Sequence, residues 1–470
     1  MSVWVRDSLG GGMVEVGQEG KVGLYVCGPT VYDHIHIGNA RAPLFWDVVV
    51  RYLRSRGYDV TFVQNITDIE DKIINKANEE GVPWQEIVDR YTGSFHERLG
   101  MLGIGLPDVE PRATEHIPEM ISLIEELVEK GYAYAAGNGD VYFSVESFPE
   151  YGALSHQRPK EMRETEKGQT EHKRSPLDFA LWKASKPGEP EWPSPWGPGR
   201  PGWHIECSAM VGKHLPDGAD IHGGGTDIRF PHHENELAQS AAAHPGHAFV
   251  RAWAHHGMVT LQSGKMAKSV GNVLDVGRAI DLHGRNAVRM WLLQSHYSQP
   301  IEYSEEILEE KRRSYERLLR LYRQISDSGT SSELSDRLAS DLRGRFDDAM
   351  RDDLNTPEVV AKLFEVANAA AREISDRSAK ADEFASLAGA MEEVMTVFGF
   401  DLGRELSAEV DGVRVRFSEE PDEKVPGLAA HRERARREKD WETADRLRDE
   451  LAEAGWAVED TPEGPVLSRR

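Results

Sequence analysis

The stretch "KVGLYVCGPTVYDHIHIGNARAPLFWDVVVRYLRSRGYDVTFVQNITDIEDK" (21–72) contains the pattern that decides the fold. Residues 21–28 are a short apolar run closed by a Gly-Pro pair, which is typical of a buried strand. Apolar residues then recur at helical spacing over 44–53 and stop before a glycine, and a second β-rich run covers 58–72. Strand, helix and strand in this order predict a right-handed unit of a parallel, doubly wound (Rossmann-like) α/β sheet.

Composition limits the class of protein. The chain has 470 residues, enough for two to four domains, with 39% hydrophobic and 29% charged residues. It contains no run of 18 apolar residues, and its start, "MSVWVRDSLGGG", lacks the basic and apolar regions of a signal peptide, so we expect a cytoplasmic protein without a membrane partner. The net charge of −24 argues against non-specific binding of polyanions but allows a local basic face.

Downstream segments predict the domain organisation. "ADIHGGGTDI" (219–228) and "AWAHHGMVTLQSG" (252–264) indicate further strands of the same sheet, so the sheet is interrupted by an insertion. The insertion has a helical stretch, a strand pair with a glycine turn, and a Pro/Gly/Trp-rich passage (186–203) expected to be an extended loop. Long charged helices follow. The predicted boundaries are 1–114 with 201–304 for the sheet domain, 115–200 for the insertion, 305–402 for a helical bundle and 403–470 for a small C-terminal domain.

The loop between the first strand and the first helix, "YDHIHIGNARA", is a candidate nucleotide site. His34 and His36 lie in the loop, Gly38 permits close backbone approach, and the helix N-terminus offers free N–H groups and the positive end of its dipole. Such a junction can bind phosphates. An ordinary strand-to-helix loop is the alternative.

A second loop, "SGKMAKSVGN" (263–272), follows a later strand. Lys265 and Lys268 lie three positions apart, so both can reach the β- and γ-phosphates of a nucleotide and neutralise the charge of departing pyrophosphate. A solvated surface loop would have the same composition.

Together these loops resemble the H-x-G-H and K-M-S-K-S signatures of class I aminoacyl-tRNA synthetases. Here they read His-Ile-Gly-Asn and Lys-Met-Ala-Lys-Ser. Each differs from the signature at one residue, Asn39 in the first and Ala267 in the second. Asn39 keeps a hydrogen-bonding side chain, and Ala267 removes a hydroxyl but no charge. The resemblance implies ATP with Mg²⁺ as the nucleotide. It also implies a catalytic role for His36, Lys265 and Lys268. These three would bind ATP together with His34, Gly38 and Asn39.

Two cysteines and one short motif suggest a metal site. Cys27 and Cys207 are too few for a disulfide framework, which leaves buried thiols, one bridge, or metal ligation. "PHHENE" (231–236) places two imidazoles and two carboxylates in six positions. Its alternative interpretation is a helix N-terminus, where acidic residues interact favourably with the dipole.

This combination resembles the zinc-binding pattern of the cysteinyl-tRNA synthetases. By that resemblance the ligands are Cys27, Cys207, His232 and Glu236, with His233 as the runner-up. His232 and Glu236 are four apart and share a face if the helix begins at the preceding proline. The remaining side chains of the motif, His233 and Glu234, are expected to point elsewhere, as support for the ligands or at the surface.

Zinc in such an enzyme would serve recognition of the amino acid. Cysteine and serine differ by one atom, and a hydrophobic pocket separates such near-isosteres by only about 10- to 200-fold. A thiol that coordinates zinc is deprotonated and bonds strongly, whereas an alcohol does neither readily. The modest insertion leaves no segment for a separate editing domain, in agreement with this idea.

The resemblance also assigns residues that physical chemistry alone does not. Thr30 and Trp203 resemble amino-acid pocket residues, and "HGGGTD" (222–227) resembles the contact loop in which Gly224 approaches the nucleotide and Asp227 holds the α-ammonium. Turn chemistry and core packing are the alternatives. "NITDIEDKI" (65–73) is typical of the family, but we assign it no role.

The C-terminal third resembles the tRNA-binding part of the same family. "MRDDLNTPEVVAKLF" resembles the anticodon-binding bundle, and the tail "ARREKDWETADRLRDELAEAGWAVEDT" its small anticodon domain. By that match Trp441 stacks on a base, Asp445 accepts hydrogen bonds from a guanine edge, and Arg436 holds phosphate. A solvated amphipathic helix is the alternative, and the last residues depart from the family's usual ending.

The expected activity is therefore ATP-dependent attachment of L-cysteine to its tRNA through a cysteinyl-adenylate, by a protein expected to be a monomer. One alternative is the mycothiol-pathway ligase, which shares the cysteine-adenylating core and joins cysteine to an amino sugar. Another is a non-catalytic, zinc-containing tRNA-binding paralogue. Cysteine-dependent ATP–pyrophosphate exchange and charging of tRNA distinguish the three.

Overall fold

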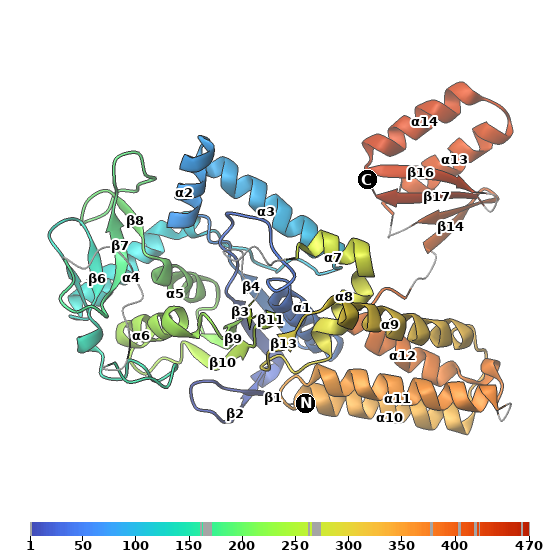
Figure 1. The fold of residues 1–470 in the computed structure, drawn as a ribbon, viewed down its shortest axis with the longest axis horizontal. Helices are drawn as coiled ribbons and strands as arrows, with labels where there is room; N and C mark the ends of the chain where they lie inside the picture. The colour runs from blue at the N-terminus through green and yellow to red at the C-terminus, as the bar shows by residue number, and fades with distance from the viewer. Residues whose placement is uncertain are drawn as a thin grey trace. The chain divides into compact units, whose positions relative to one another are not determined.

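The computed structural model describes residues 2–159, 162, 172–261, 264–265, 274–376, 379–402, 406–417, 421–422, 424–461 and 464–469 (Figure 1). The chain forms two compact units, Met1–Phe400 and Asp401–Arg470. Each unit is described by itself below. No helix within the described ranges has the length and apolarity needed to cross a bilayer.

A four-stranded parallel sheet lies at the centre of the first unit (Figure 1). Its order is β10-β9-β3-β4, and all neighbouring strands are parallel. The strands are β3 (Lys21–Val26), β4 (Asp59–Gln64), β9 (Ala219–Gly225) and β10 (Val250–His256). Helix α1 (Arg41–Ser55) connects β3 to β4, which confirms the predicted strand–helix–strand unit. Because the strands are parallel, their carboxyl ends share one edge, and the site is built there.

Helices and short strands surround this sheet. The N-terminal hairpin is β1 (Val3–Arg6) with β2 (Met13–Val16). The helices are α2 (Asp71–Glu80), α3 (Trp84–Met101), α5 (Trp203–His214), α6 (Glu234–Ala243), α7 (Val276–His283) and α8 (Arg285–Leu293). A small sheet of order β12-β11-β13 consists of β11 (Val259–Leu261), β12 (Gly264–Lys265) and β13 (Ile301–Glu302).

The insertion contains a sheet of its own. Helix α4 (Ile117–Glu129) packs beside an antiparallel sheet of order β5-β6-β7-β8. Its strands are β5 (Ala133–Ala135), β6 (Val141–Phe143), β7 (Phe179–Ala184) and β8 (Gly199–Pro201). The predicted helix and strand pair are confirmed. The Pro/Gly/Trp-rich passage is not wholly an extended loop, because residues 199–201 pair with β7.

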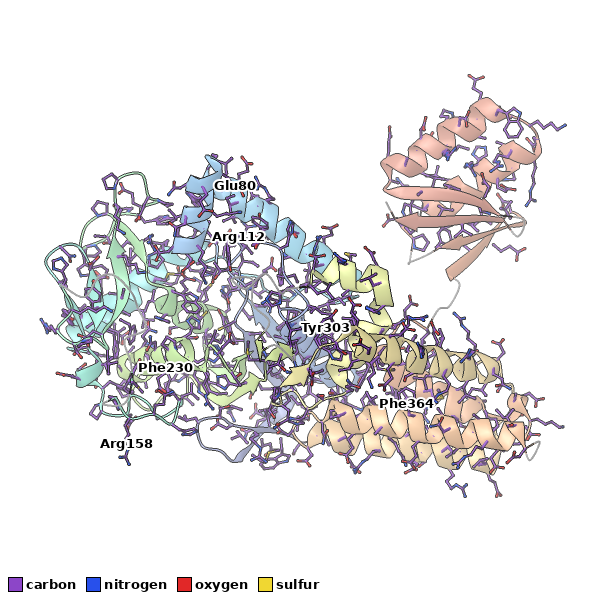
Figure 2. The ribbon with its side chains drawn as sticks, viewed as in Figure 1. Glu80, Arg112, Arg158, Phe230, Tyr303 and Phe364 are labelled. Atoms are coloured by element: carbon purple, nitrogen blue, oxygen red, sulfur yellow. The ribbon has the colours of Figure 1, made fainter. Side chains whose placement is uncertain are left out.

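The rest of the first unit is a helical bundle, as the charged amphipathic pattern predicts. It comprises α9 (Glu305–Ile325), α10 (Glu333–Arg351), α11 (Thr356–Ser375) and α12 (Ala385–Val397). Apolar side chains such as Leu342, Phe346 and Met391 are fully buried in it. Figure 2 shows the side chains as sticks on the ribbon, around the central sheet and along the helices of the bundle.

The second unit is an α/β module rather than a helical tail. Helices α13 (Val425–Arg437) and α14 (Trp441–Glu453) pack on a sheet of order β14-β15-β17-β16. The strands are β14 (Leu406–Val410), β15 (Val413–Phe417), β16 (Trp456–Thr461) and β17 (Gly464–Arg469). The helices match the sequence expectation, whereas the strands were not predicted. Asp411-Gly412, a strong hairpin-turn dipeptide, was the available signal, and both residues have positive φ.

Candidate active site

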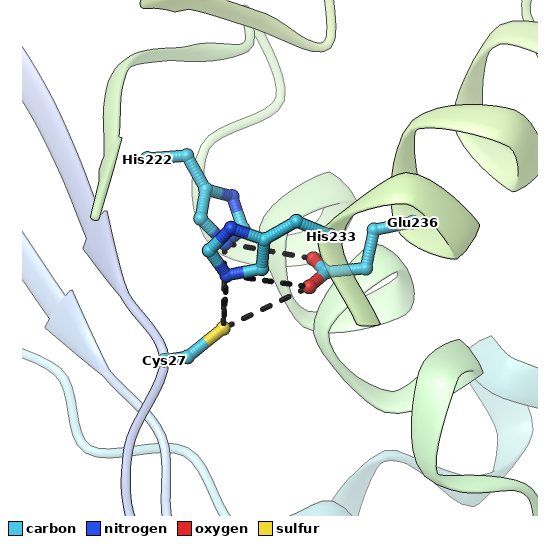
Figure 3. Close-up of side chains that lie close together, drawn as sticks. All are labelled: Cys27, His222, His233 and Glu236. Atoms are coloured by element: carbon cyan, nitrogen blue, oxygen red, sulfur yellow. Dashed lines mark hydrogen bonds and ion pairs between the residues drawn. The ribbon is translucent and has the colours of Figure 1, made fainter. Parts of the chain in front are cut away.

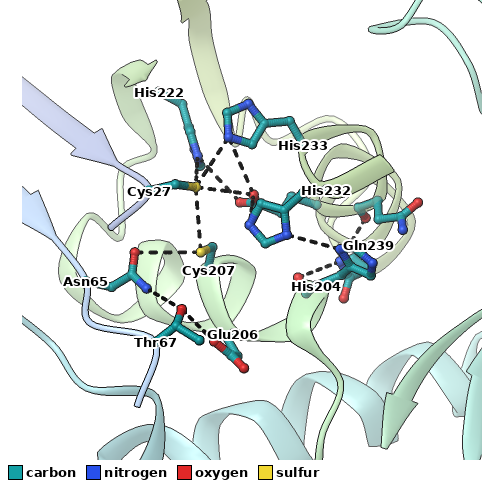
Figure 4. A network of polar contacts seen from close by, with 12 residues as sticks. Cys27, Asn65, Thr67, His204, Glu206, Cys207, His222, His232, His233 and Gln239 are labelled. Carbon is teal, nitrogen blue, oxygen red and sulfur yellow. Dashed lines mark hydrogen bonds and ion pairs between the residues drawn. The ribbon is translucent and has the colours of Figure 1, made fainter. Parts of the chain in front are cut away.

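The four expected metal ligands meet at the carboxyl edge of the central sheet. Cys27 directly follows β3, Cys207 lies in α5, and His232 and Glu236 flank the start of α6. The two sulfur atoms are 3.8 Å apart, Cys27 Sγ is 3.7 Å from Glu236 Oε1, and His232 Nε2 is 3.0 Å from the same oxygen. Residues separated by up to 209 positions are thus brought into one buried cluster (Figure 4).

These spacings suit a tetrahedral zinc site. Zn–S bonds of about 2.3 Å at tetrahedral angles place two sulfurs about 3.8 Å apart, and Zn–N and Zn–O bonds near 2.1 Å place those atoms about 3.3 to 3.6 Å from their neighbours. The sulfur–sulfur and sulfur–oxygen distances lie close to these values, whereas the 3.0 Å between His232 Nε2 and Glu236 Oε1 is shorter. Glu236 Oε2 is buried and accepts no hydrogen bond from the described residues, as expected of a carboxylate suited to a cation.

A second donor set overlaps the first. Cys27 Sγ lies 3.4 Å from His222 Nε2 and 3.3 Å from His233 Nε2, while His222 Nε2 lies 3.6 Å from Glu236 Oε2 (Figure 3). Both sets of four could hold a metal ion. The sequence analysis named His233 as the runner-up and missed His222. The strand that carries His222 was predicted from the sequence, but its place beside β3 follows only from the sheet order.

The structure corrects the expectation for the rest of "PHHENE". His233 does not point elsewhere, since it is fully buried and faces Cys27. Glu234 is not at the surface either: its carboxylate is buried and accepts backbone N–H groups of Gly152 and Ser155 in the insertion. Helix α6 begins at Glu234 rather than at the proline, after a separate turn over Arg229–His233.

Desolvation disfavours charge on several groups of this cluster, whereas the hydrogen bond from Cys27 lowers the pKa of the Cys207 thiol. Desolvation raises the pKa of the Glu236 carboxyl and of the Cys27 thiol, in the latter case with a further contribution from Cys207. Desolvation also lowers the pKa of His222 and His233, so these imidazoles are neutral near pH 7. Neutral imidazoles cannot compensate the negative charge of two thiolates and a carboxylate. A divalent cation can, and it requires these deprotonated forms as ligands.

Aromatic packing fixes the imidazole of His232. The Trp203 ring stacks on it, with centroids 4.2 Å apart and planes inclined by 19°. On its other side, His232 Nδ1 lies 3.0 Å from His204 Nδ1. Trp203, expected in the amino-acid pocket, therefore contacts a candidate ligand directly.

A cavity of about 500 Å³ opens beside the cluster. Five of the ten residues expected to bind ATP or cysteine line it, together with the candidate ligand Cys27; the five are Thr30, His36, Gly38, Asn39 and Asp227. Neither His34 nor Gly224 nor Trp203 is among its lining residues. His34 Nδ1 instead lies 2.5 Å from Ser94 Oγ of α3, and a Cβ at position 224 would lie 2.4 Å from the His233 ring.

The His-Ile-Gly-Asn segment is held in a tight turn at the start of α1. His36 Nδ1 accepts the N–H of Gly38, and Asn39 Oδ1 accepts the N–H of His36. A Cβ at position 38 would lie 2.9 Å from the His36 ring, so glycine is needed for this geometry. The turn also pairs with Leu274, which accepts the N–H of Ile37.

The lysine loop is described only in part. The backbone of Lys265 belongs to β12 and pairs with Thr260 of β11. Lys268 and Ala267 lie outside the described residues. Their expected contacts with ATP stay predictions.

The expected tRNA-contacting residues lie together in the second unit. Trp441, the first residue of α14, has 58% of its surface exposed, which suits a stacking platform better than a core position. Asp445 lies one turn further along the helix and is exposed. Arg436, at the end of α13, forms an ion pair with Asp460, so part of its charge is already compensated.

Comparison with known proteins covers the whole chain. The family model described as "tRNA synthetases class I (C) catalytic domain" matches residues 13–313, the "DALR domain" matches 345–403, and the "Cysteinyl-tRNA ligase anticodon binding domain" matches 422–464. The cysteine–tRNA ligase of Rubrobacter xylanophilus is 72% identical over 470 residues, covering 100% of both chains. That of Alkalilimnicola ehrlichii is 48% identical over 457 residues, covering 96% of each.

Among solved structures, a methionyl-tRNA synthetase of Mycobacterium tuberculosis in complex with methionyl-adenylate resembles the chain with a TM-score of 0.61. It is 18% identical and the match covers 80% of this chain and 89% of that one, so the likeness concerns the fold alone. The sequence matches are full-length and specific. The chain therefore belongs to the cysteinyl-tRNA synthetases, the cysteine–tRNA ligases among the class I aminoacyl-tRNA synthetases.

Proposed function

We propose that this enzyme activates L-cysteine with ATP and transfers it to its tRNA, using zinc to select the thiol. The cysteine carboxylate attacks the α-phosphorus, the bond to the β-phosphate oxygen breaks, and pyrophosphate leaves. The cysteinyl-adenylate then passes its acyl group to a ribose hydroxyl at the end of the tRNA, and AMP leaves. The observation that carries the zinc part is the convergence of two thiols, an imidazole and a carboxylate in one buried cluster beside the cavity.

The proposed ligands are Cys27, Cys207, His232 and Glu236. Two sulfurs favour this set over the one with His222 and His233, because zinc binds thiolate strongly. Bound zinc would supply a Lewis acid that ionises a thiol and binds it strongly. It would neither ionise nor bind a hydroxyl group as readily. Trp203 would keep the His232 ring in place, and Thr30 and Asp227, both in the cavity wall, would hold the rest of the amino acid.

For ATP we propose His36, Gly38 and Asn39 as contacts in the cavity, with Lys265 and Lys268 neutralising the departing pyrophosphate. Preorganised charge and positioning suffice for this step, because no covalent bond to the protein forms. Mg²⁺ would accompany ATP as part of the substrate. Gly224 supports the site by leaving room for His233 rather than by facing the cavity.

For tRNA we propose the second unit as the anticodon reader, with Trp441 stacking on a base, Asp445 contacting a base edge and Arg436 near phosphate. The matched anticodon-binding family at 422–464 and the exposed indole support this assignment. The domain boundaries proposed above, a monomeric state and a cytoplasmic location complete the proposal.

Cysteine-dependent ATP–pyrophosphate exchange, with serine as the competing substrate, tests the proposal. Cys207→Ala should remove stoichiometric zinc and raise the KM for cysteine steeply while leaving the KM for ATP near its original value. Retained zinc together with undiminished rejection of serine in this variant would refute the ligand set. The amino-sugar ligase alternative has no support from the full-length matches to cysteine–tRNA ligases.

A further inference from the structure

The segment Asn65–Asp68, the start of the "NITDIEDKI" motif, has no role in the function proposed above. Asn65 follows β4 directly, at the same sheet edge as Cys27, and only 1% of its surface is exposed. A buried amide must find hydrogen-bond partners, so its contacts indicate what the motif does.

The backbone of this segment continues strand pairing beyond β4. Thr67 donates its N–H to the carbonyl of Pro29, and Val31 donates to the carbonyl of Thr67. The loop that carries Cys27 and Thr30 is therefore fixed on one side by residues 65–67. On its other side, the N–H of Cys27 bonds to the carbonyl of Gly223 in β9.

The Asn65 side chain links the two elements that carry the sulfurs. Its Oδ1 accepts the N–H of Gly28, the residue after Cys27, at 2.9 Å and lies 3.8 Å from Cys207 Sγ. Its Nδ2 donates to Thr67 Oγ1, which donates to Glu206, the neighbour of Cys207 in α5. Figure 4 shows this chain of contacts, which runs from Asn65 at the end of β4 through Thr67 to Glu206 in α5.

We propose that Asn65 is a positioning residue for thiol selection: it sets the spacing between the Cys27 and Cys207 sulfurs that a metal ion requires. The inference rests on the proposed zinc site, which it extends beyond the four ligands. Among the described residues, no backbone hydrogen bond joins Cys27 to Cys207. The amide supplies the connection, because it offers an acceptor toward Gly28 and Cys207 and donors toward Thr67.

The side-chain type matters as much as its position. An aspartate would keep the acceptor for Gly28 but lose the donor to Thr67, and it would add negative charge 3.8 Å from Cys207 Sγ. An alanine would remove all three contacts. Partners that orient metal ligands typically change metal affinity about 10- to 100-fold when they are removed.

The test compares Asn65→Ala with Asp68→Asn as a matched control in the full-length protein. Asp68 is equally buried and lies in the same motif, but its carboxylate accepts from Thr114 and contacts no cysteine. The readouts are zinc affinity measured by competition with a chromophoric chelator, and the thiolate-to-metal absorption of the Co²⁺-substituted protein. Activity is a third readout.

We expect Asn65→Ala to weaken zinc binding by about 10- to 100-fold, to alter the Co²⁺ spectrum and to raise the KM for cysteine but not for ATP. Asp68→Asn should change none of these. Thr67→Val removes both the acceptor of Asn65 Nδ2 and the link to Glu206 but keeps the bond from Gly28 to Asn65 Oδ1. It should shift affinity in the same direction by less, and it serves if Asn65→Ala does not fold.

An unchanged metal affinity and Co²⁺ spectrum in both Asn65→Ala and Thr67→Val would overturn the inference while leaving the zinc proposal intact. A wild-type protein that binds no stoichiometric zinc would overturn both. The two failures are therefore distinguishable from the wild-type measurement alone.

Discussion

Replacing Arg41 by methionine should destabilise the first unit far more than any surface substitution. Arg41 is the first residue of α1 and is 98% shielded from solvent, with 2% of its surface exposed. Its guanidinium donates to four backbone carbonyls, those of Gly257 and Gln299 at 2.6 Å, His296 at 3.2 Å and Met258 at 3.5 Å. Arg41 thereby joins the start of α1, just after the His-Ile-Gly-Asn turn, to the segments that precede β11 and β13.

The magnitude follows from these bonds. Burial lowers the pKa of Arg41 to about 10, so the side chain is charged at pH 7. Hydrogen bonds to a charged group contribute about 1.5 to 3 kcal/mol each, and two of the four are short, so Arg41→Met should cost about 3 to 6 kcal/mol. At about 2 °C per kcal/mol for a large domain, the melting temperature should fall by about 6 to 12 °C.

Thermal unfolding followed by tryptophan fluorescence measures this shift, with Arg54→Met as the control. Arg54 lies in the same helix, but its ion-pair partner is Asp108, it donates to only one backbone carbonyl, that of Val60, and both charged side chains are nearly half exposed, so its loss should cost less than about 1 kcal/mol. Arg41→Lys should lie between the two variants, because one ammonium keeps the charge but cannot serve four carbonyls. If Arg41→Met melts within about 2 °C of Arg54→Met, the reasoning from buried bonds is wrong.

Three further predictions use other contacts. Gly28→Ala should abolish soluble expression, since its Cβ would lie 1.5 Å from a backbone carbonyl oxygen, whereas Gly93→Ala, in open space on α3, should leave expression and melting temperature intact. Arg289→Met should lower stability in thermal unfolding by about 3 to 5 kcal/mol, because it leaves the buried carboxylate of Asp47 without one of its cations. Trp441→Ala should raise the KM for tRNA about 10-fold or more, through lost stacking, with cysteine-dependent pyrophosphate exchange unchanged; an equal loss in both assays would contradict a role confined to tRNA.

Local sequence patterns were enough for much of the framework. The apolar run before Cys27, the helical spacing after the His-Ile-Gly-Asn turn and the next β-rich run predicted β3, α1 and β4 correctly. Other strands were missed, including β8 inside a Pro-rich passage and the four strands of the second unit. In the second unit β14 pairs with β15 and β16 with β17, which are neighbours in the chain, so these strands could have been found from local patterns. Among the described strands of this unit, only the pairing of β15 with β17 joins residues far apart in the chain, which local propensity does not encode.

The candidate metal ligands illustrate the same division. The residue types and the four-residue spacing of His232 and Glu236 are properties of the sequence, and resemblance to a family identified their cysteine partners. The sequence did not reveal His222, nor that His233 faces Cys27 rather than solvent.

What the sequence determined by itself, then, is which chemical groups the enzyme has and which elements carry them. Only the tertiary structure decided which groups meet. Cys27 and Cys207 are 180 positions apart, and they approach because the strand order β10-β9-β3-β4 brings the carboxyl ends of parallel strands to one edge against α5 and α6. Burial there removes water from thiols, imidazoles and carboxylate alike, which makes their uncompensated charged forms unfavourable in a cluster that could hold a metal ion.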